Sequence, residues 1–318
     1  MTSKPDNPPR ILLVGATGQV GRELLRTLAP VGPVFATARS PGAFAGTAQR
    51  LILDVTDLDA VRRTVREVRP AIIVNAAAYT AVDRAESEPD LAMLVNGIMP
   101  GMLAEEARAA GTALVHYSTD YVFDGGGTRP WREDDVTNPL NAYGRTKLAG
   151  EEAIRAAGVA HVILRISWIY AAHGHNFVRT MLKLASERTE LRVVADQVGG
   201  PTPAAAVATT TAEILRLAGD SPAEFLREHG GTFHLPVAGE TSWHGFAEEI
   251  FRLAGAAGLS LRVERVLPIT TAEYPTPARR PLNSRLDGWR VRERFGLALP
   301  DWRAALAAEF PKIVQGLQ

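Results

Sequence analysis

Tyr143 and Lys147 lie four residues apart, in the segment Tyr143-Gly144-Arg145-Thr146-Lys147. If this segment is helical, the phenol and the ammonium share one face of the helix. A free tyrosine titrates near pH 10, and an adjacent cation would favour the phenolate, bringing the group closer to working pH as a proton donor and acceptor. Alone, this spacing is weak, because it occurs by chance in many helices.

A second segment, which contains hydroxyl groups, supports a catalytic role for Tyr143 and Lys147. Tyr117-Ser118-Thr119-Asp120-Tyr121 ends an apolar run that has the character of a buried strand. The carboxyl ends of parallel strands are where an α/β sheet opens its ligand crevice. A hydroxyl there could hydrogen-bond a substrate oxygen on which charge develops during hydride transfer. We favour Thr119 over Ser118 for this role, although Thr119 alone could equally be a capping hydroxyl.

Three glycines lie between the first apolar run and the helical pattern that follows it. The loop is Gly15-Ala16-Thr17-Gly18-Gln19-Val20-Gly21. Glycines let a backbone approach a pyrophosphate closely, and free N–H groups at a helix start stabilise the anion. Its GxxGxxG spacing differs from the strict GxGxxG fingerprint of dinucleotide-binding proteins. A simple tight turn is the alternative, but the strand-glycine-helix context favours a dinucleotide, with Gly15, Thr17, Gly18, Gln19, Val20 and Gly21 as contacts.

The end of the second expected strand reads Thr37-Ala38-Arg39-Ser40 and has no acidic residue for a ribose hydroxyl. Arg39 could pair with a 2′-phosphate, which favours NADPH over NADH, with Ser40 beside it. A solvated surface arginine is the competing interpretation. Asp54 and Val55 close the third strand, where they could touch the adenine.

Short β-branched runs alternate with amphipathic stretches from Arg10 onward, which is typical of a doubly wound parallel sheet of the Rossmann α/β class. The expected strands are Ile11–Val14, Pro33–Ala38, Arg50–Leu53, Ala71–Asn75, Ala113–Ser118 and His161–Ser167. The expected helices are Gly21–Leu28, Leu58–Val68, Pro89–Ala110 and Tyr143–Ala157.

Prolines break this alternation after about Trp168, which predicts a smaller C-terminal lobe. Thr232–Leu235 still has the character of a buried strand, so part of the later chain should return to the first sheet. We expect a flexible tail over residues 1–9 and a dinucleotide-binding domain over 10–168. Part of 201–235 should complete that domain, with 169–318 mainly a substrate-binding lobe.

Charge and composition exclude several classes of protein. The chain has 35 basic and 35 acidic residues, so no net field would attract nucleic acid or an anionic membrane. It has no cysteine, which excludes disulfides and thiolate metal ligands. No apolar run approaches the roughly 20 residues of a membrane helix, and the start lacks a signal-peptide core. We expect a cytoplasmic protein with a small-molecule partner and no metal site.

Taken together, these segments resemble the extended short-chain dehydrogenase/reductases, and within them the subfamily that reduces nucleotide-activated 4-keto-6-deoxysugars. The likeness runs nearly end to end. The glycine loop and the Tyr/Lys pair are shared across the superfamily, whereas other segments are more specific. These are Asn75–Asp83, TDYVFDG at Thr119–Gly125, SWIY at Ser167–Tyr170, DQVGGPT at Asp196–Thr202 and RPLNS at Arg280–Ser284.

The resemblance implies reduction of dTDP-4-dehydro-6-deoxy-L-mannose (dTDP-4-dehydro-L-rhamnose) to dTDP-L-rhamnose by hydride from NADPH or NADH. In that reaction Tyr143 would protonate the new alkoxide, Lys147 would lower the pKa of Tyr143 and hold the nicotinamide ribose, and Thr119 would bond the substrate oxygen. Further implied cofactor contacts are Asn75, Ala76, Ala77, Ala78 and Tyr79. Implied substrate contacts are Val82, Asp120, Tyr121 and Trp168, with Asn176, Arg279 and Arg280 for the diphosphate; the aromatics could instead be core and the arginines surface groups.

Two rival functions remain open. A nucleotide-sugar epimerase or dehydratase shares the loop and the Tyr/Lys pair, but related dehydratases follow the threonine with Asp-Glu, where this chain has Asp120-Tyr121. A non-catalytic regulatory subunit, similar to the partner of methionine adenosyltransferase, is the other rival. Some family members are inferred to form a Mg²⁺-supported dimer through acidic residues that do not map onto this chain, so both monomer and homodimer stay open.

Overall fold

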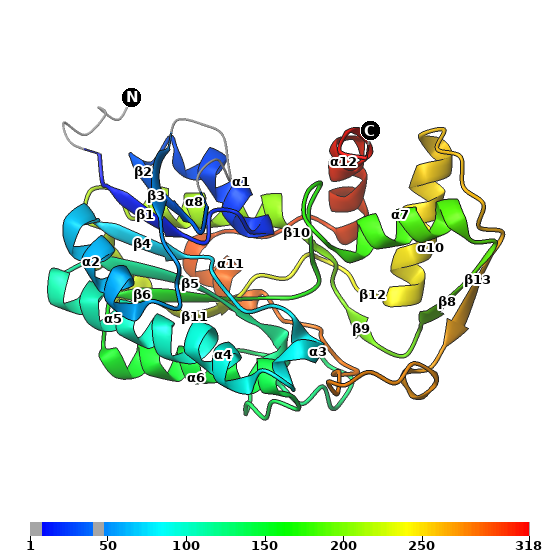
Figure 1. Ribbon diagram of the computed structural model, residues 1–318, viewed down its shortest axis with the longest axis horizontal. Coiled ribbons are helices and arrows are strands. Elements are labelled where there is room, and N and C mark those ends of the chain that lie inside the picture. Colours follow the sequence, from blue (N-terminus) through cyan, green and yellow to red (C-terminus); the bar gives the residue numbers. More distant parts are fainter. Residues whose placement is uncertain (1–7, 41–47, 318) are drawn as a thin grey trace.

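The computed structural model describes residues 8–40 and 48–317, so most of the expected N-terminal tail lies outside the described residues. A parallel sheet with helices on both faces forms one side of the molecule, and a smaller group of helices and short strands forms the other (Figure 1). This arrangement confirms the predicted Rossmann α/β class. The proposed domain limits stay a prediction.

The central sheet has seven strands among the described residues, all of them parallel. In spatial order they are β11 (Gly231–His234), β6 (His161–Ile166), β5 (Ala113–Thr119), β4 (Ile72–Asn75), β1 (Ile11–Val14), β2 (Val34–Ala38) and β3 (Gln49–Ile52). Each expected strand forms within one residue of its predicted ends. The strong agreement follows from burial, because β1, β4 and β5 are buried throughout and so read as continuous apolar runs.

Helices cover both faces of this sheet. One face packs against α1 (Gln19–Leu28) and α8 (Ala204–Leu217), and the other against α2 (Leu58–Val68), α5 (Met99–Ala110) and α6 (Ala142–Ala157). The stretch Pro89–Ala110, expected as one helix, contains α4 (Pro89–Met93), the π-helical turn η1 (Leu94–Ile98) and α5. A π turn inside a helix often marks a functional position, and here its Asn96 lies close to the cavity described below.

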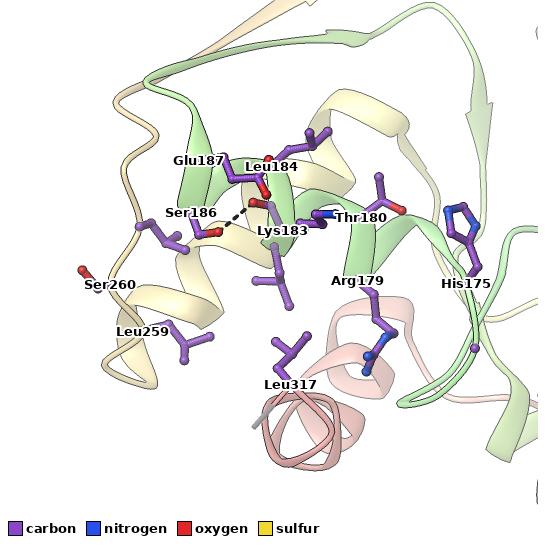
Figure 2. Close-up of a pocket in the computed structure, with 13 residues that line it drawn as sticks. His175, Arg179, Thr180, Lys183, Leu184, Ser186, Glu187, Leu259, Ser260 and Leu317 are labelled. Atoms are coloured by element: carbon purple, nitrogen blue, oxygen red, sulfur yellow. Dashed lines mark hydrogen bonds between the residues drawn. The ribbon is translucent and has the colours of Figure 1, made fainter.

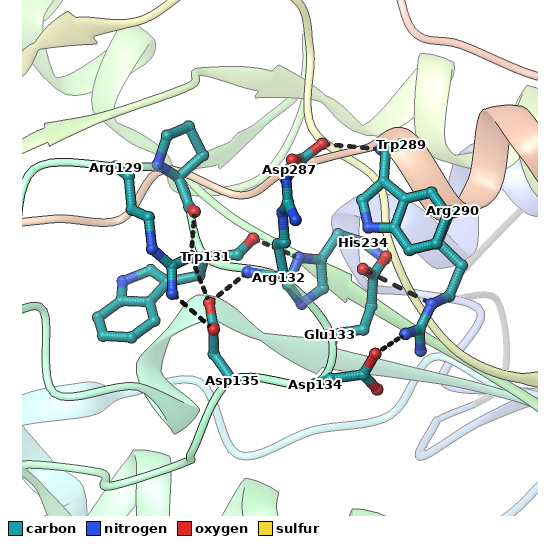
Figure 3. A network of polar contacts seen from close by, with 11 residues as sticks. Arg129, Trp131, Arg132, Glu133, Asp134, Asp135, His234, Asp287, Trp289 and Arg290 are labelled. Atoms are coloured by element: carbon teal, nitrogen blue, oxygen red, sulfur yellow. Dashed lines mark hydrogen bonds and ion pairs between the residues drawn. The ribbon is translucent and has the colours of Figure 1, made fainter.

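The later part of the chain returns to the sheet, as predicted for Thr232–Leu235. Strand β11 pairs with β6 in parallel, with Phe233 opposite Leu164. Residues 129–135 cover the outer edge of β11, where Glu133 Oε1 accepts a hydrogen bond of 2.9 Å from His234 N. Figure 3 shows this network, in which Glu133 and Asp134 both face Arg290. The segment closes an edge that would otherwise expose unpaired backbone groups.

Two further helices, α9 (Pro222–His229) and α11 (Trp289–Phe295), pack against β5, β6 and β11 of the central sheet. The smaller group contains the helices α7 (Phe177–Glu187), α10 (Trp243–Ala256) and α12 (Trp302–Gln315) and the 3₁₀ turn η3 (Thr271–Glu273). Its short strands are β7 (Ile169–Tyr170), β8 (Glu190–Val194), β9 (Val198–Gly199), β10 (Thr202–Pro203), β12 (Thr241–Ser242) and β13 (Arg265–Ile269). Two shorter elements, α3 (Val82–Ala85) and the 3₁₀ turn η2 (Asp120–Val122), follow β4 and β5. Within the described ranges, no helix has the length and apolar character needed to cross a membrane.

Candidate active site

The predicted site residues follow the carboxyl ends of three neighbouring strands. Strand β1 has β2 on one side and β4 on the other, so the direction of winding reverses there. Such a reversal opens a crevice at the carboxyl edge of the sheet. The glycine loop follows β1, residues 76–81 follow β4, and Thr119 ends β5.

Two of the three glycines in the loop are required by close backbone contacts. Gly15 has φ +84°, and a Cβ there would lie 2.5 Å from Ala77 N. A Cβ at Gly21 would lie 2.1 Å from Gly15 O. Side chains at these positions would push the loop away from both β4 and α1, so the glycines hold the start of α1 against the crevice.

A cavity of about 480 Å³ adjoins this loop. It is a size that accommodates a small ligand. The predicted cofactor contacts in its lining are Gly15, Thr17, Gly18, Arg39, Asp54, Val55, Ala76, Ala77, Ala78 and Tyr79. Residues that are far apart in sequence are therefore brought to one cavity, which supports their assignment as a group.

Other predicted cofactor residues lie outside this lining. Gln19 Oε1 accepts a hydrogen bond from Asn176, Gly21 is buried against the loop, and Ser40 is exposed just beyond β2. Val20 is partly buried in α1 and packs against the core, and Asn75 is fully buried at the end of β4. These residues shape the loop and its surroundings, and their direct contact with a cofactor stays a prediction.

The sequence interpretation missed charged residues at the mouth of the cavity. Arg84 and Glu88 line it and form an ion pair of 2.6 Å. The Tyr79 hydroxyl donates a hydrogen bond to Glu88 as well, and Asn96 of the π turn binds both backbone groups of Tyr79. Arg84 and Glu88 fit an ordinary surface i, i+4 pair, so no sequence signal set them apart.

Tyr143 lies in the first turn of α6, close to the end of β5. Asn141 caps this helix by accepting a hydrogen bond of 2.8 Å from Gly144 N. The rings of Tyr121 and Tyr143 meet edge to face, with centroids 5.6 Å apart. The Thr119 hydroxyl lies close enough to the Tyr143 hydroxyl to affect its pKa. The predicted acid and the predicted hydroxyl donor are therefore neighbours at the crevice.

Lys147, which the resemblance assigns to lowering the pKa of Tyr143, is not among the groups that shift that pKa in this structure, so its role stays a prediction. Burial raises the pKa of Tyr143, the nearby charge of Asp120 raises it further, and the nearby hydroxyl of Thr119 lowers it only in part. Lys147 acts elsewhere, since its Nζ donates a hydrogen bond of 2.6 Å to Tyr117 O and lies 3.1 Å from His116 Nε2. Burial also lowers the pKa of Lys147 to about 8, which weakens it as a cation.

Asp120 is a buried carboxyl group directly after Thr119. Its Oδ1 accepts a hydrogen bond of 3.1 Å from Thr119 Oγ1, while Oδ2 has no hydrogen-bond partner among the described residues. Burial raises the pKa of Asp120 to about 6, and the nearby hydroxyl groups of Ser284 and Thr119 offset this only in part. An unpaired buried oxygen at this position is available to a ligand group.

One predicted sugar contact, Trp168, belongs to an aromatic pair whose second member was not predicted from the sequence. Trp168 stacks on Trp243, with centroids 3.6 Å apart and planes 12° from parallel. Trp168 has φ +50°, a conformation that a bulky residue rarely adopts and that functional sites often hold. Trp243 Nε1 donates a hydrogen bond of 3.1 Å to Gln197. Trp243 lies 75 positions from Trp168 in a segment with no motif, so only the fold could bring them together.

The predicted diphosphate contacts differ in their surroundings. Arg280 forms an ion pair of 2.8 Å with Asp83 and lies 3.5 Å from the Tyr121 hydroxyl, beside Val82 at the start of α3. Arg279 is exposed. Asn176 caps α7, and its Nδ2 donates to Gln19 Oε1 and to Ala171 O. These bonds occupy its donors, so the structure supports a structural role for Asn176 in place of the predicted diphosphate contact.

A larger cavity, of about 800 Å³, lies against the outer side of α7 (Figure 2). Its lining includes His175, Arg179, Lys183 and Leu317 and none of the predicted site residues. Among residues 8–40 and 48–317 there is no group of three or more His, Cys, Asp or Glu side chains placed to hold a metal ion.

Comparison with known proteins agrees with this geometry. The family profile described as RmlD substrate binding domain matches residues 9–314. The dTDP-4-dehydrorhamnose reductase of Shigella flexneri is 46% identical over 93% of this chain and 95% of its own length. That of Salmonella typhimurium is 48% identical over 92% and 94%. A Bacillus anthracis dTDP-4-dehydrorhamnose reductase, solved in complex with NADP, superposes with a TM-score of 0.84 at 34% identity, over 96% of this chain and 99% of that one. The chain therefore belongs to the dTDP-4-dehydrorhamnose reductase family of extended short-chain dehydrogenase/reductases.

Proposed function

We propose that this chain is a cytoplasmic reductase that uses NADPH to convert the 4-keto group of dTDP-4-dehydro-6-deoxy-L-mannose to the alcohol of dTDP-L-rhamnose. The relatives named dTDP-4-dehydrorhamnose reductase match nearly the whole chain. The observation that carries the proposal is the proximity of Thr119 and Tyr143 at the end of β5. This strand end lies at the same edge of the parallel sheet as the glycine loop that lines the cavity.

The residues present fit a nicotinamide dinucleotide. The loop glycines leave room that a Cβ would fill, and the start of α1 presents free N–H groups for a pyrophosphate. Arg39 lines the same cavity and acts electrostatically on Asp54, whose pKa is lowered mainly by hydrogen bonds from Thr56. With no acidic residue at the end of β2 to bind a ribose hydroxyl, Arg39 favours a 2′-phosphate and hence NADPH.

The proposed reaction transfers one hydride and one proton. When bound, the nicotinamide supplies the hydride to C4 of the sugar, and the carbonyl oxygen becomes an alkoxide. Tyr143 gives its hydroxyl proton to that oxygen. Because burial raises the pKa of Tyr143, the phenol keeps its proton at neutral pH until the more basic alkoxide forms. Thr119 would turn its one hydroxyl hydrogen from Asp120 Oδ1 to the same oxygen, which stabilises the developing charge.

The sugar would lie between these groups and the smaller lobe. Tyr121 and the Trp168–Trp243 stack offer flat apolar surfaces for a deoxysugar ring. Arg280 lies beside Tyr121, partly neutralised by Asp83, and could contact the diphosphate. Dehydration would need a second carboxylate after Asp120, and the side chain there is Tyr121, so simple reduction is favoured.

The direct test is oxidation of NADPH on addition of the dTDP-4-keto-6-deoxysugar, followed at 340 nm, with the product's C4 configuration assigned by NMR. Tyr143→Phe should still bind NADPH but turn over about 10²- to 10⁴-fold more slowly. Tyr274→Phe is the matched control, because Tyr274 is 59% exposed and distant in sequence from the catalytic segments. Turnover of Tyr143→Phe within a few-fold of the control would reject the assigned proton donor.

A further inference from the structure

Beneath the crevice, three buried polar side chains form a line from β4 through β5 to α6. They are Asn75, His116 and Lys147, each at most 2% exposed. His116 Nδ1 lies 3.1 Å from Asn75 Nδ2, and His116 Nε2 lies 3.1 Å from Lys147 Nζ. The family resemblance assigns Lys147 to the nicotinamide ribose, but it gives His116 no role.

The hydrogen-bond donors and acceptors of these three side chains indicate the protonation state of each. Asn75 Oδ1 accepts a hydrogen bond of 3.2 Å from Ala77 N, so Nδ2 is the end that faces His116. His116 Nδ1 must therefore accept. Burial, and next the charge of Lys147, lower the pKa of His116 well below its usual range, so the ring is neutral and carries its one hydrogen on Nε2.

That hydrogen points at Lys147 Nζ. An ammonium has three donors and no acceptor, so a charged Lys147 would oppose one N–H with another. A neutral amine has a lone pair that accepts from His116 Nε2, and it still donates to Tyr117 O at 2.6 Å. The contact therefore favours an uncharged Lys147, which is the majority form above about pH 8.

The surrounding charges do not reverse this conclusion. Glu151, one turn further along α6, is the acid that acts on Lys147, but it is held by Arg165 at 2.7 Å and by Arg155 at 3.1 Å. His161 on β6 also acts on His116 and lowers its pKa. On the side of β4, the side chain that contacts His116 is Asn75, which is uncharged.

We propose that His116 is a positioning residue for Lys147. In alkaline solution and without cofactor, His116 Nε2–H holds Lys147 as a neutral amine, and Lys147 takes up one proton when it leaves His116 to act as a cation at the bound dinucleotide. The second half of this statement rests on the proposed function. Because the loaded protein holds one more proton, cofactor affinity falls as the pH rises. The decrease should approach tenfold per pH unit above about 8, the pKa to which burial lowers Lys147.

The first test reads the hydrogen position in the protein without cofactor. With ¹⁵N-labelled histidine at pH 9, the His116 signals, assigned from their loss in His116→Gln, should show hydrogen on Nε2 and none on Nδ1. Hydrogen on Nδ1 would mean that Asn75 is reversed and that Lys147 donates to the ring as an ammonium, which would overturn the proposal. This measurement uses the unaltered protein, so it does not depend on the folding of a variant.

The second test measures NADPH binding by calorimetry between pH 7.5 and 9.5, in two buffers of different ionisation enthalpy. The unaltered protein should take up close to one proton at pH 9, and its affinity should fall as described. In His116→Gln the amide oxygen can accept from the Lys147 ammonium, so uptake should fall below about a third of a proton. His161→Gln is the matched control and should keep the full uptake. Equal uptake in all three proteins would refute the role of His116. Sugar turnover enters neither test, so failure of the proposed reaction would be recognised separately.

Discussion

The buried carboxyl group of Asp120 allows the free-energy cost of ionising a side chain at the crevice to be measured directly. Its carboxyl group is 3% exposed, with one oxygen bound to Thr119 and the other unpaired among the described residues. The change to make is Asp120→Asn, which keeps the shape of the side chain and an acceptor for Thr119. It removes the ability to become charged and adds an N–H₂ group in place of one oxygen.

The expected magnitude follows from the pKa, which burial raises from 3.8 to about 6. Each unit of pKa difference corresponds to about 1.4 kcal/mol, so ionising Asp120 in the folded state costs about 3 kcal/mol. The folded state binds more protons than the unfolded state between these two values. Stability should therefore fall as the pH rises from about 4 to about 6, and it should stay lower above that range.

The assay is urea unfolding of both proteins from pH 4 to pH 8, read as the difference between their free energies of unfolding, in which the titration of other groups cancels. At pH 4, the asparagine protein should be the less stable by about 1–3 kcal/mol, because its new N–H lacks a partner. By pH 7 the difference should shift by about 3 kcal/mol in its favour. A difference that stays constant within about 0.5 kcal/mol would show that Asp120 titrates alike in both states and would refute this account of the crevice.

Two further changes test the edges of the site and of the sheet. Arg39→Ala should weaken NADPH binding about 10- to 100-fold, because a hydrogen bond to a charged group contributes about 1.5–3 kcal/mol. NADH binding should change less than twofold. Equal losses of affinity for both cofactors would rule out the contact with the 2′-phosphate. Glu133→Ala should lower the free energy of unfolding by about 1–3 kcal/mol, because it leaves His234 N without its acceptor. Glu133→Gln retains that acceptor and should recover most of the loss. Similar urea midpoints for the two variants would contradict this role of Glu133.

The elements of the central sheet could be predicted because their signals are local. Strands buried on both faces are apolar throughout, and the glycines that β4 and α1 require stand at the first turn between strand and helix. The helix Leu58–Val68 was predicted to the residue, since its apolar spacing and the capping Asp57 are both within the segment. The π turn at Leu94–Ile98 could not be predicted, because one extra residue in a turn leaves the apolar pattern almost unchanged.

The second half of the site depends on contacts between distant segments. Trp243 stacks on Trp168 only because β12 and β9 pair and bring α10 toward the crevice. Asn176 matched the family pattern, yet its amide serves the backbone of the loop before α7 and Gln19 of the glycine loop. A motif shows which residue types recur; it does not show whether their polar atoms are already occupied.

The Tyr143–Lys147 pair shows most clearly where spacing stops being informative. Four residues on a helix fix the distance between a phenol and an ammonium, but the pKa of each depends on water and on neighbours from other strands. Burial raises the pKa of Tyr143, so the phenol stays protonated at neutral pH, and it lowers the pKa of Lys147, so the ammonium loses its proton more readily than that of a free lysine. For an oxidation, which begins by removing a proton, this would be a poor arrangement. A reduction ends by delivering a proton to an alkoxide, and a phenol that keeps its hydrogen until then is the form that reaction needs.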